Sequence, residues 1–324
     1  MDQSMQVTQG QPPAPAVAEG RFAHHGRGGE LFLIMLMNVV LKVITLGVYH
    51  FWAKTRVRRY LWSQTSYLDE RFEYTGTGLD LLLGFLQAVV LMALAVVGAL
   101  LVLKMAPETL PALLVVGWLM LLWLIGAASF GAAGYRLRHT RWRGIRFALS
   151  GSAVRHGWLF LAHLLISALT LGLAHPYARM LLIRHFYSGL HFGSEPLRFE
   201  GRARHLMRSW LLAWVLLIPT LGLSILWYQA AESRYVASRM RLQDMEFNLA
   251  LTGGALLWLL FTNLLLLAFT LGLALPWVMV RNARFLMERL STRGEVDFNA
   301  VLQSQGQSGT AGEGFAEALN LGGI

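Results

Sequence analysis

One apolar stretch near the N-terminus, Leu31–Ala53, carries most of the information about the fold; its sequence is LFLIMLMNVVLKVITLGVYHFWA. Lys42 is the one Lys, Arg, Asp or Glu in it. Because about 20 apolar residues in a helix cross a ~30 Å hydrocarbon core, this stretch is long enough to span a membrane. Five later stretches also reach that length: Leu81–Leu103, Thr109–Tyr135, Gly157–Ala178, Ser209–Ala231 and Phe247–Val280. The sequence therefore predicts about six transmembrane helices.

The composition also indicates a membrane protein. The chain has 324 residues, of which 55% are hydrophobic and 14% charged, whereas soluble domains carry about 25% charged residues. This excludes a disordered chain, a coiled coil and a nucleic-acid-binding module. The formal net charge of +10 comes from Lys and Arg between apolar runs, so we expect anionic lipid headgroups as partners and no nucleic acid. With no Cys, disulfides and Cys-based metal sites are excluded.

An internal repeat organises most of the chain. Thr-Leu-Gly occurs four times, and an aromatic residue and an Arg follow each Thr at fixed distances of 7 and 14 residues. The Thr positions are Thr45, Thr170, Thr220 and Thr270, the aromatic positions are Trp52, Tyr177, Trp227 and Trp277, and the Arg positions are Arg59, Arg184, Arg234 and Arg284. This agreement indicates one hydrophobic unit that has been duplicated.

Each unit is expected to be an apolar helix, a Thr-Leu-Gly break and a basic amphipathic helix. Gly weakens a helix, and Thr can bond back to a carbonyl, so the first helix should loosen there. The aromatic ring suits the headgroup level, and the Arg-bearing helix should lie along the membrane surface. Alternating residues in 71–76 and 146–151 predict short strands in the loops. The predicted fold class is thus an all-α polytopic membrane protein.

The chain is predicted to divide into three parts. Residues 1–29 form a polar N-terminus that we expect to be disordered, and residues 301–324 form a flexible tail. The membrane domain, residues 30–300, contains the repeats and one helical hairpin. Its units lie near 22–72, 147–199, 199–247 and 247–298, and the hairpin occupies 79–135.

The positive-inside rule does not choose an orientation, because alternate loops of a six-crossing topology carry nearly equal numbers of Lys and Arg. Adjacent units could be inverted relative to each other, as in many transporters. Alternatively, some Thr-Leu-Gly units could re-enter without crossing, which would leave every basic loop on one side and make 79–135 the one certain hairpin. We favour six crossings with both termini in the cytoplasm.

Several segments resemble a known family. They are 29–32, Asn38, 45–56, 58–62 and 72–78, and they are similar to the YjgN-like family of uncharacterised bacterial inner-membrane proteins. The resemblance is most specific over the first 85 residues, and Ser224, Ile225 and Leu226 depart from it in the third unit. It implies a multi-pass protein of the bacterial inner (plasma) membrane. The family has no established activity to carry over.

No catalytic motif is present in the sequence. Gly-x-Ser-x-Gly, His-Glu-x-x-His, the P-loop and Gly-x-Gly-x-x-Gly are all missing. His163 and His175 lie on one apolar stretch, but a continuous helix would place them about 120° apart, so a shared metal is not expected. The sequence therefore predicts neither an enzyme nor a metal or cofactor site.

Polar residues inside the apolar stretches are the candidate functional groups. Asn38, His163 and Asn263 each precede a Thr-Leu-Gly by 7 residues, so three units place a polar side chain at one depth. Lys42 shares a helical face with Asn38. These side chains could hydrogen-bond helices together, or they could line a path for a solute or proton. Lys42 could instead reach the interface.

Three functions are compatible with the sequence. The leading hypothesis is transport or binding of a small solute along Asn38, Lys42, His163 and Asn263. The alternative is a non-transporting scaffold that engages anionic lipid or a partner protein, and the third is a lipid-active enzyme. Small residues at Ala127, Gly131 and Gly134 permit close helix contact, either within a monomer or in a homo-oligomer.

Overall fold

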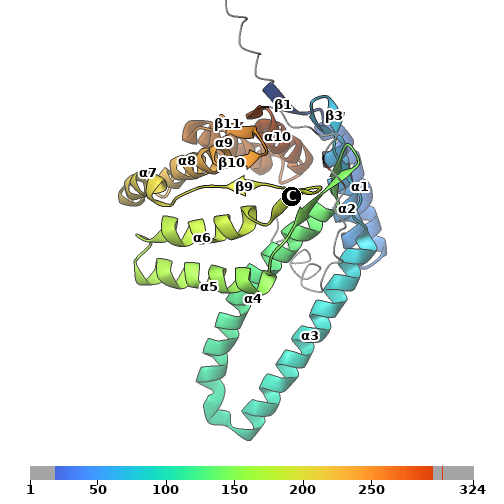
Figure 1. The fold of residues 1–324 in the computed structure, drawn as a ribbon. Helices are drawn as coiled ribbons and strands as arrows, with labels where there is room; N and C mark the ends of the chain where they lie inside the picture. The colour runs from blue at the N-terminus through green and yellow to red at the C-terminus, as the bar shows by residue number, and fades with distance from the viewer. Residues whose placement is uncertain (1–18, 295–300, 302–324) are drawn as a thin grey trace, which may run out of the picture.

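The computed structural model describes residues 19–294 and residue 301. Most of these residues are helical, and the rest form short strands (Figure 1). The helices are α1 (Gly28–Ile44), α2 (His50–Ser63), α3 (Gly78–Met105), α4 (Leu110–Arg138), α5 (Ala153–Leu169), α6 (His175–Tyr187), α7 (Arg204–Val215), α8 (Ser224–Ser238), α9 (Gly253–Phe269) and α10 (Leu275–Met287), with the 3-10 helix η1 (Pro107–Thr109) between α3 and α4.

The strands form two antiparallel sheets on one side of the helices (Figure 1). They are β1 (Glu19–His24), β2 (Thr65–Tyr67), β3 (Glu70–Arg71), β4 (Glu73–Tyr74), β5 (Thr140–Trp142), β6 (Ile145–Leu149), β7 (Leu190–Phe192), β8 (Glu195–Pro196), β9 (Arg198–Phe199), β10 (Met240–Leu242), β11 (Met245–Leu249) and β12 (Leu290–Arg293). One sheet has the order β3-β2-β1-β12-β11-β10-β9, and the other has the order β4-β5-β6-β7-β8.

Together the two sheets form a ring of strands. The chain passes from one sheet to the other at two single residues, Phe72 between β3 and β4 and Leu197 between β8 and β9. The first strand, β1, pairs with the last, β12, through Glu19 opposite Arg293 and Arg21 opposite Ser291. Every strand therefore has a neighbour on both sides, by pairing or by direct connection. Closure of this kind protects sheet edges from pairing with other chains.

Four short helical hairpins are connected to the strands at both ends: α1–α2, α5–α6, α7–α8 and α9–α10. In each hairpin, both ends lie within a few residues of a strand, and the Thr-Leu-Gly motif forms the tip. The Leu of each tip has a φ near +50°, and the following Gly has a φ of 85–92°. Those four leucines are exposed, at 78–95% of their surface. The conformation costs energy for a Leu, and it leaves an apolar side chain at the end of every hairpin.

The Thr of each tip joins the two helices of its hairpin. Thr45 donates to the Leu41 carbonyl (2.7 Å) and accepts from the Tyr49 backbone N–H (3.0 Å). Thr170, Thr220 and Thr270 form the same pair of bonds, to the residues four before and four after each Thr. One hydroxyl therefore caps the end of the first helix and the start of the second.

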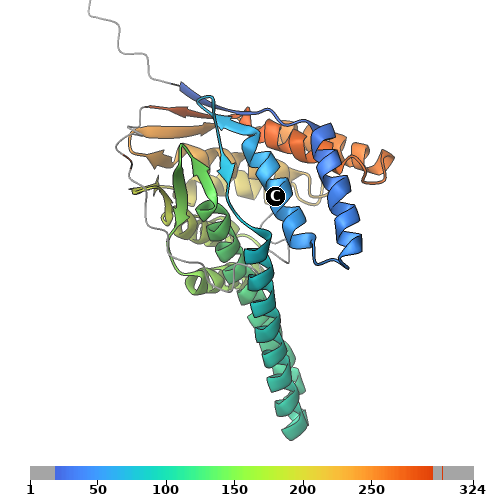
Figure 2. The ribbon, with the colours of Figure 1, turned by 90° about the vertical axis from the view of Figure 1, so that its right-hand side faces the viewer.

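The long hairpin α3–α4 projects away from the rest of the molecule (Figure 2). Among the described residues, α3 and the η1–α4 segment are the two helices long and apolar enough to cross a membrane, and only 6% of each apolar window is buried. Thr77 and Asp80 form a capping box that fixes the start of α3. The sequence predicted both helices of this hairpin correctly.

The structure corrects other parts of the prediction. The fold is not all-α, because the loop strands build two sheets. The other four apolar stretches are not single long helices: each bends back at Thr-Leu-Gly, so six transmembrane helices are not confirmed. The predicted disordered N-terminus includes β1 and the start of α1, while residues 1–18 lie outside the described residues. In the predicted flexible tail, Val301 is buried against Tyr67 and Trp142; residues 302–324 lie outside the described residues.

Candidate functional site

The four arginines of the repeated motif each connect one short hairpin to the helical hairpin beside it in the ring. Each guanidinium donates to a backbone carbonyl just before the next helical hairpin. The bonds are Arg59 to Gly76 (3.5 Å), Arg184 to Gly201 (3.1 Å), Arg234 to Leu251, and Arg284 to Gly26 (2.9 Å). Because Arg284 and Gly26 lie near opposite ends of the chain, the last of these bonds closes the ring.

Three of the four repeated aromatic residues pack against a glycine at the start of the next helix. The pairs are Trp52 with Gly78, Trp227 with Gly253, and Trp277 with Gly28. A Cβ on any of these glycines would overlap the base of the indole ring. No described glycine has Tyr177 among its nearest atoms, and Tyr177 is about half exposed, as Trp227 and Trp277 also are. The aromatic and arginine positions thus hold successive hairpins together, a role that the sequence did not suggest.

The polar residues that we expected to line a path are each buried within their own hairpin. Asn38 donates to the Ala53 carbonyl (3.3 Å), and Asn263 donates to the Asn282 side-chain oxygen (2.7 Å). His163 lies 5.0 Å from the His175 ring, edge to face. In each pair, one residue comes from the first helix of a hairpin and the other comes from the second.

The third short hairpin, α7–α8, has a different polar contact between its two helices. There the Ser224 hydroxyl on α8 donates to the Ala213 carbonyl on α7 (2.7 Å). Lys42 is half-buried in the last turn of α1, where a cation stabilises the C-terminal end of the helix dipole. Within the part of the chain that the structure describes, no hydrogen bond connects any two of Asn38, Lys42, His163 and Asn263. The structure therefore distributes these side chains over three hairpins.

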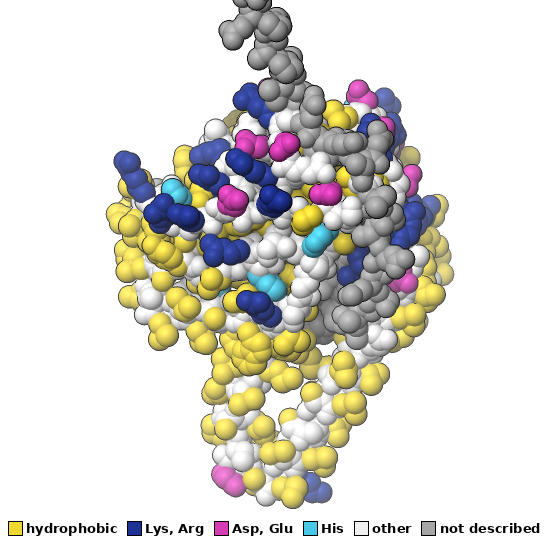
Figure 3. All heavy atoms as spheres, viewed as in Figure 1, with side chains coloured by type: hydrophobic (Ala, Val, Ile, Leu, Met, Phe, Trp, Pro, Cys, Tyr) yellow, Lys and Arg dark blue, Asp and Glu magenta, His cyan; other side chains and the backbone are white. Residues whose placement is uncertain are grey.

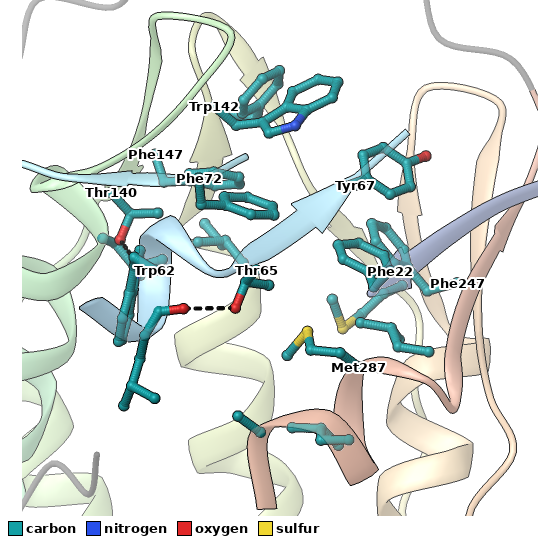
Figure 4. Close-up of a pocket in the computed structure, with 18 of the residues that line it drawn as sticks. Phe22, Trp62, Thr65, Tyr67, Phe72, Thr140, Trp142, Phe147, Phe247 and Met287 are labelled. Carbon is teal, nitrogen blue, oxygen red and sulfur yellow. Dashed lines mark hydrogen bonds between the residues drawn. The ribbon is translucent and has the colours of Figure 1, made fainter. Parts of the chain in front are cut away.

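A central cavity of about 630 Å³ lies below the ring of strands. Residues from the first and last short hairpins, the long hairpin and both sheets line it, and nearly all are aromatic, aliphatic or Met. Figure 4 shows Phe22, Phe72 and Phe247 around this space, with Trp142 above and Met287 below. Other lining residues are Trp62, Tyr67, Leu137, Phe147, Leu190, Phe192, Leu197, Met240, Leu242, Met245, Met279 and Ala283. We call this the apolar cavity.

Polar groups on the wall of the apolar cavity are already hydrogen-bonded to protein. The Trp62 indole donates to the Thr140 hydroxyl (2.9 Å), and the Thr65 hydroxyl donates to the Leu61 carbonyl (2.9 Å; Figure 4). The Tyr67 hydroxyl bonds to Thr292 (2.7 Å). Burial raises the Tyr67 pKa, so this phenol stays neutral. The cavity is therefore suited to an apolar ligand.

A second cavity of about 590 Å³ adjoins the apolar cavity. The two share Met240, Phe247, Leu286 and Leu290 in their walls. The second one also contains charged side chains from three helices: Arg136 on α4, and Arg179 on α6, whose Nε pairs with Glu232 on α8 at 3.3 Å. We call this the charged cavity. Side by side, the two cavities offer an apolar compartment and a compartment with guanidinium groups.

Sequence reasoning did not find these cavities. One signal was a recurring Phe: Phe22, Phe147 and Phe247 each lie 23 residues before a Thr-Leu-Gly, and all three line the apolar cavity together with Phe72. Arg179 and Glu232 gave no such signal, because they belong to different units and meet only in the folded ring.

Comparison with known proteins identifies the family. The family model described as "Bacterial protein of unknown function (DUF898)" matches residues 19–227 and again residues 212–318, which together cover most of the chain. The chain belongs to this family. Its membership confirms the resemblance to YjgN-like proteins noted from the first unit.

The curated relatives of this DUF898 protein match over a short segment. Inner membrane protein YjgN of Escherichia coli K12 is 44% identical over 57 residues, which is 18% of this chain and 14% of that protein. Inner membrane protein YjgN of Salmonella typhimurium LT2 is 42% identical over 53 residues, 16% and 13% respectively. The matched segment thus covers about a seventh of these relatives. No solved structure matches the chain significantly.

Proposed function

We propose that the protein resides in the bacterial inner membrane, with α3–α4 crossing the bilayer and the strands in water. The length and exposed apolar surface of α3 and α4 support this. Figure 3 shows Lys and Arg gathered on the strand side, while hydrophobic side chains cover the long hairpin below it. The names of the matched YjgN proteins agree with this location.

We further propose that the four short hairpins enter the membrane from one side without crossing it. Their apolar tips are exposed, and both ends of each hairpin lie at the ring of strands. This favours re-entrant units over six crossings, and it explains the tie in the Lys and Arg counts, because every basic loop then faces the same side.

Single-cysteine labelling tests this topology, since the natural chain has no Cys. Arg155→Cys and Arg208→Cys should react with an impermeant maleimide from the same face of the membrane, and Glu108→Cys should react from the other face. All three positions are exposed in the structure. Labelling of Arg155→Cys and Arg208→Cys from opposite faces would establish six crossings and overturn the re-entrant arrangement.

As the biochemical function, we propose binding of an amphipathic lipid-like ligand in the two adjoining cavities. The observation that carries the proposal is the shared wall between an apolar cavity and a cavity with Arg136 and Arg179. A hydrocarbon chain would occupy the first cavity, driven by about 25 cal/mol per Å² of buried apolar surface. An anionic group would reach the guanidinium groups of the second cavity.

Native mass spectrometry of protein extracted from membranes tests this function. Ala283 lines the apolar cavity, so Ala283→Phe should fill it and remove a bound lipid adduct that the wild type retains. Ala93 lies exposed on α3, so Ala93→Phe is the matched control and should keep the adduct. Equal retention by both variants, or no adduct on the wild type, would refute binding in the cavity.

Transport of a small solute remains a second proposal, but along a route other than the polar side chains named from the sequence. The hydrogen bonds of Asn38 and Asn263 support a structural role for these two side chains, so a transported molecule would pass through the central cavities. The scaffold hypothesis is favoured by one observation, the exposed Lys and Arg side chains on the strand side (Figure 3). The two predict different results for Ala283→Phe, because a scaffold has no need of the cavity.

A further inference from the structure

We propose that a phosphate-bearing anion binds in a pocket between the second and third short hairpins. The pocket has a volume of about 450 Å³. Four arginines and one histidine line it, together with one carboxylate. Its residues are Arg184, Phe199, Glu200, Gly201, Arg202, Arg204, His205, Tyr235 and Arg239. We call this the basic pocket; it is separate from the apolar and charged cavities, with which it shares no lining arginine.

The backbone of the basic pocket is held in place by bonds that leave most of the guanidinium groups available. The Arg202 backbone N–H donates to the Tyr235 hydroxyl (2.7 Å), which donates in turn to the Arg202 carbonyl (3.2 Å). Arg184 uses one nitrogen on the Gly201 carbonyl (3.1 Å). Arg239 lies over the Tyr235 ring, 5.6 Å from its centroid. The pocket is thus pre-organised before any ligand arrives.

Among the described residues, no acid forms an ion pair with these arginines. Across the described residues 19–294 and 301, no carboxylate oxygen lies within 4.0 Å of a guanidinium nitrogen of Arg184, Arg202, Arg204 or Arg239. Glu200 belongs to the lining but is exposed. Four guanidinium groups around a cavity repel one another, and a multivalent anion would relieve that repulsion.

Two of the three equivalent junctions elsewhere in the ring carry an acid where the basic pocket has a histidine. Counting four residues from the carbonyl that accepts the arginine bond, Gly76 leads to Asp80 and Gly26 leads to Glu30. Both acids are engaged there: Asp80 closes a capping box, and Glu30 lies 3.9 Å from Arg27. From Gly201 the same count leads to His205, and from Leu251 it leads to Ala255.

The start of α7 lacks the side-chain cap that α3, α5 and α9 have, as does the start of α1. Thr77, Ser152 and Thr252 cap α3, α5 and α9 with their hydroxyl oxygens. Ala203, at the same place before α7, supplies no side-chain cap. The backbone N–H groups of His205 and Leu206 instead donate to the Arg202 and Ala203 carbonyls (3.3 and 2.9 Å). The arginines are therefore the donors that an anion in the basic pocket would meet, and guanidinium forks fit phosphate oxygens.

Two sources could supply a phosphate group: the headgroup of an anionic phospholipid, or a soluble phosphate ester. The probes are therefore glycerol 3-phosphate added to protein in detergent, and nanodiscs made of phosphatidylglycerol or of phosphatidylcholine. We expect one of the two phosphate sources to raise the melting temperature by several degrees. Glycerol 3-phosphate indicates a soluble ester, and a gain in phosphatidylglycerol alone indicates a headgroup.

Two variants separate a built site from general charge attraction. His205→Glu copies the acid of two other junctions; it removes the ring contact of His205 with Tyr235 (5.7 Å) but none of the Tyr235 hydrogen bonds to Arg202. It should weaken binding at least tenfold, as should Arg202→Gln combined with Arg204→Gln. Arg155→Gln removes an equally exposed arginine outside the pocket and should bind like wild type. Equal affinity in all variants, or no response to either phosphate source, would overturn the proposal.

Discussion

The long hairpin α3–α4 and the four short hairpins are both apolar, yet the structure stabilises them in different ways. The apolar windows of the long hairpin are 6% buried, and Gly98 and Gly117 along it have no atom near the position of a Cβ. In the short hairpins, glycines meet tryptophans, arginines bond to carbonyls, and buried polar groups pair. Apolar sequence alone thus does not distinguish a helix that faces lipid from one that packs in a ring.

The length of a helix therefore decides whether it depends on contacts with the rest of the protein. A helix that crosses a bilayer satisfies its backbone internally and needs few tertiary contacts. Helices of 12–17 residues, such as α1, α5, α7 and α9, are too short to cross comfortably. They depend on contacts with their neighbours, so substitutions at these contacts should be costly, whereas matched substitutions in α3–α4 should not.

The largest loss of stability is expected from substitution of a glycine that packs against a tryptophan. Gly253→Ala would overlap the base of the Trp227 ring and should lower the stability by about 2 kcal/mol. Gly98→Ala, in the open middle of α3, should raise stability by about 0.5 kcal/mol, because Ala favours the helix. Unfolding in mixed micelles measures both. Similar stability changes for Gly253→Ala and Gly98→Ala would mean that the contact between Gly253 and Trp227 does not stabilise the protein.

The closing arginine should have the next largest effect. Arg284→Met removes the bonds to the Gly26 and His24 carbonyls and should cost about 1.5 kcal/mol. Arg155→Met is the control, with no such bond among the described residues, and should change stability little. Unfolding of both proteins under one set of conditions measures the difference; a neutral Arg284→Met would show that ring closure rests on the β1–β12 pairing alone.

The strands should make stability depend on pH through His24. Burial, the Arg284 charge and His25 lower the His24 pKa from 6.5 to about 4, so the folded protein favours the neutral imidazole. The stability this contributes is complete above pH 7 and is lost as pH falls from 6.5 toward 4. Between pH 7.5 and 5.5 the loss should be about 1 kcal/mol. His24→Gln should reduce that loss, and an unchanged pH profile would contradict it.

The smallest effect is expected at the buried asparagines. Asn38→Leu and Asn263→Leu each remove one interhelical hydrogen bond and should cost about 0.6 kcal/mol, the usual value in membranes. Loss of the Asn263 bond should cost more, since it leaves the Asn282 side chain without that partner. A thermal-shift screen of metabolites on wild type and variants checks for a solute path: weakened binding with unchanged stability would restore that hypothesis.

Part of this fold could be predicted from the sequence because the signals are local. The two helices of the long hairpin follow from apolar length alone, and the four turns follow from the recurrence of Thr-Leu-Gly, since a Gly with positive φ and a capping Thr act within a few residues. The spacing of Trp227 and Arg234 after Thr220 was also evident, but its purpose was not, because the partners lie in the next hairpin.

By itself, the sequence determined the apolar character of the segments, the break at each Thr-Leu-Gly and the resemblance to the family. Only the tertiary structure decided that the apolar stretches double back, that β1 pairs with β12, and that Arg179 meets Glu232 beside an apolar cavity. The physical reason is the range of the interactions. Helix formation and turns depend on neighbours along the chain, whereas ring closure joins residues more than 250 positions apart, as Arg284 and Gly26 are.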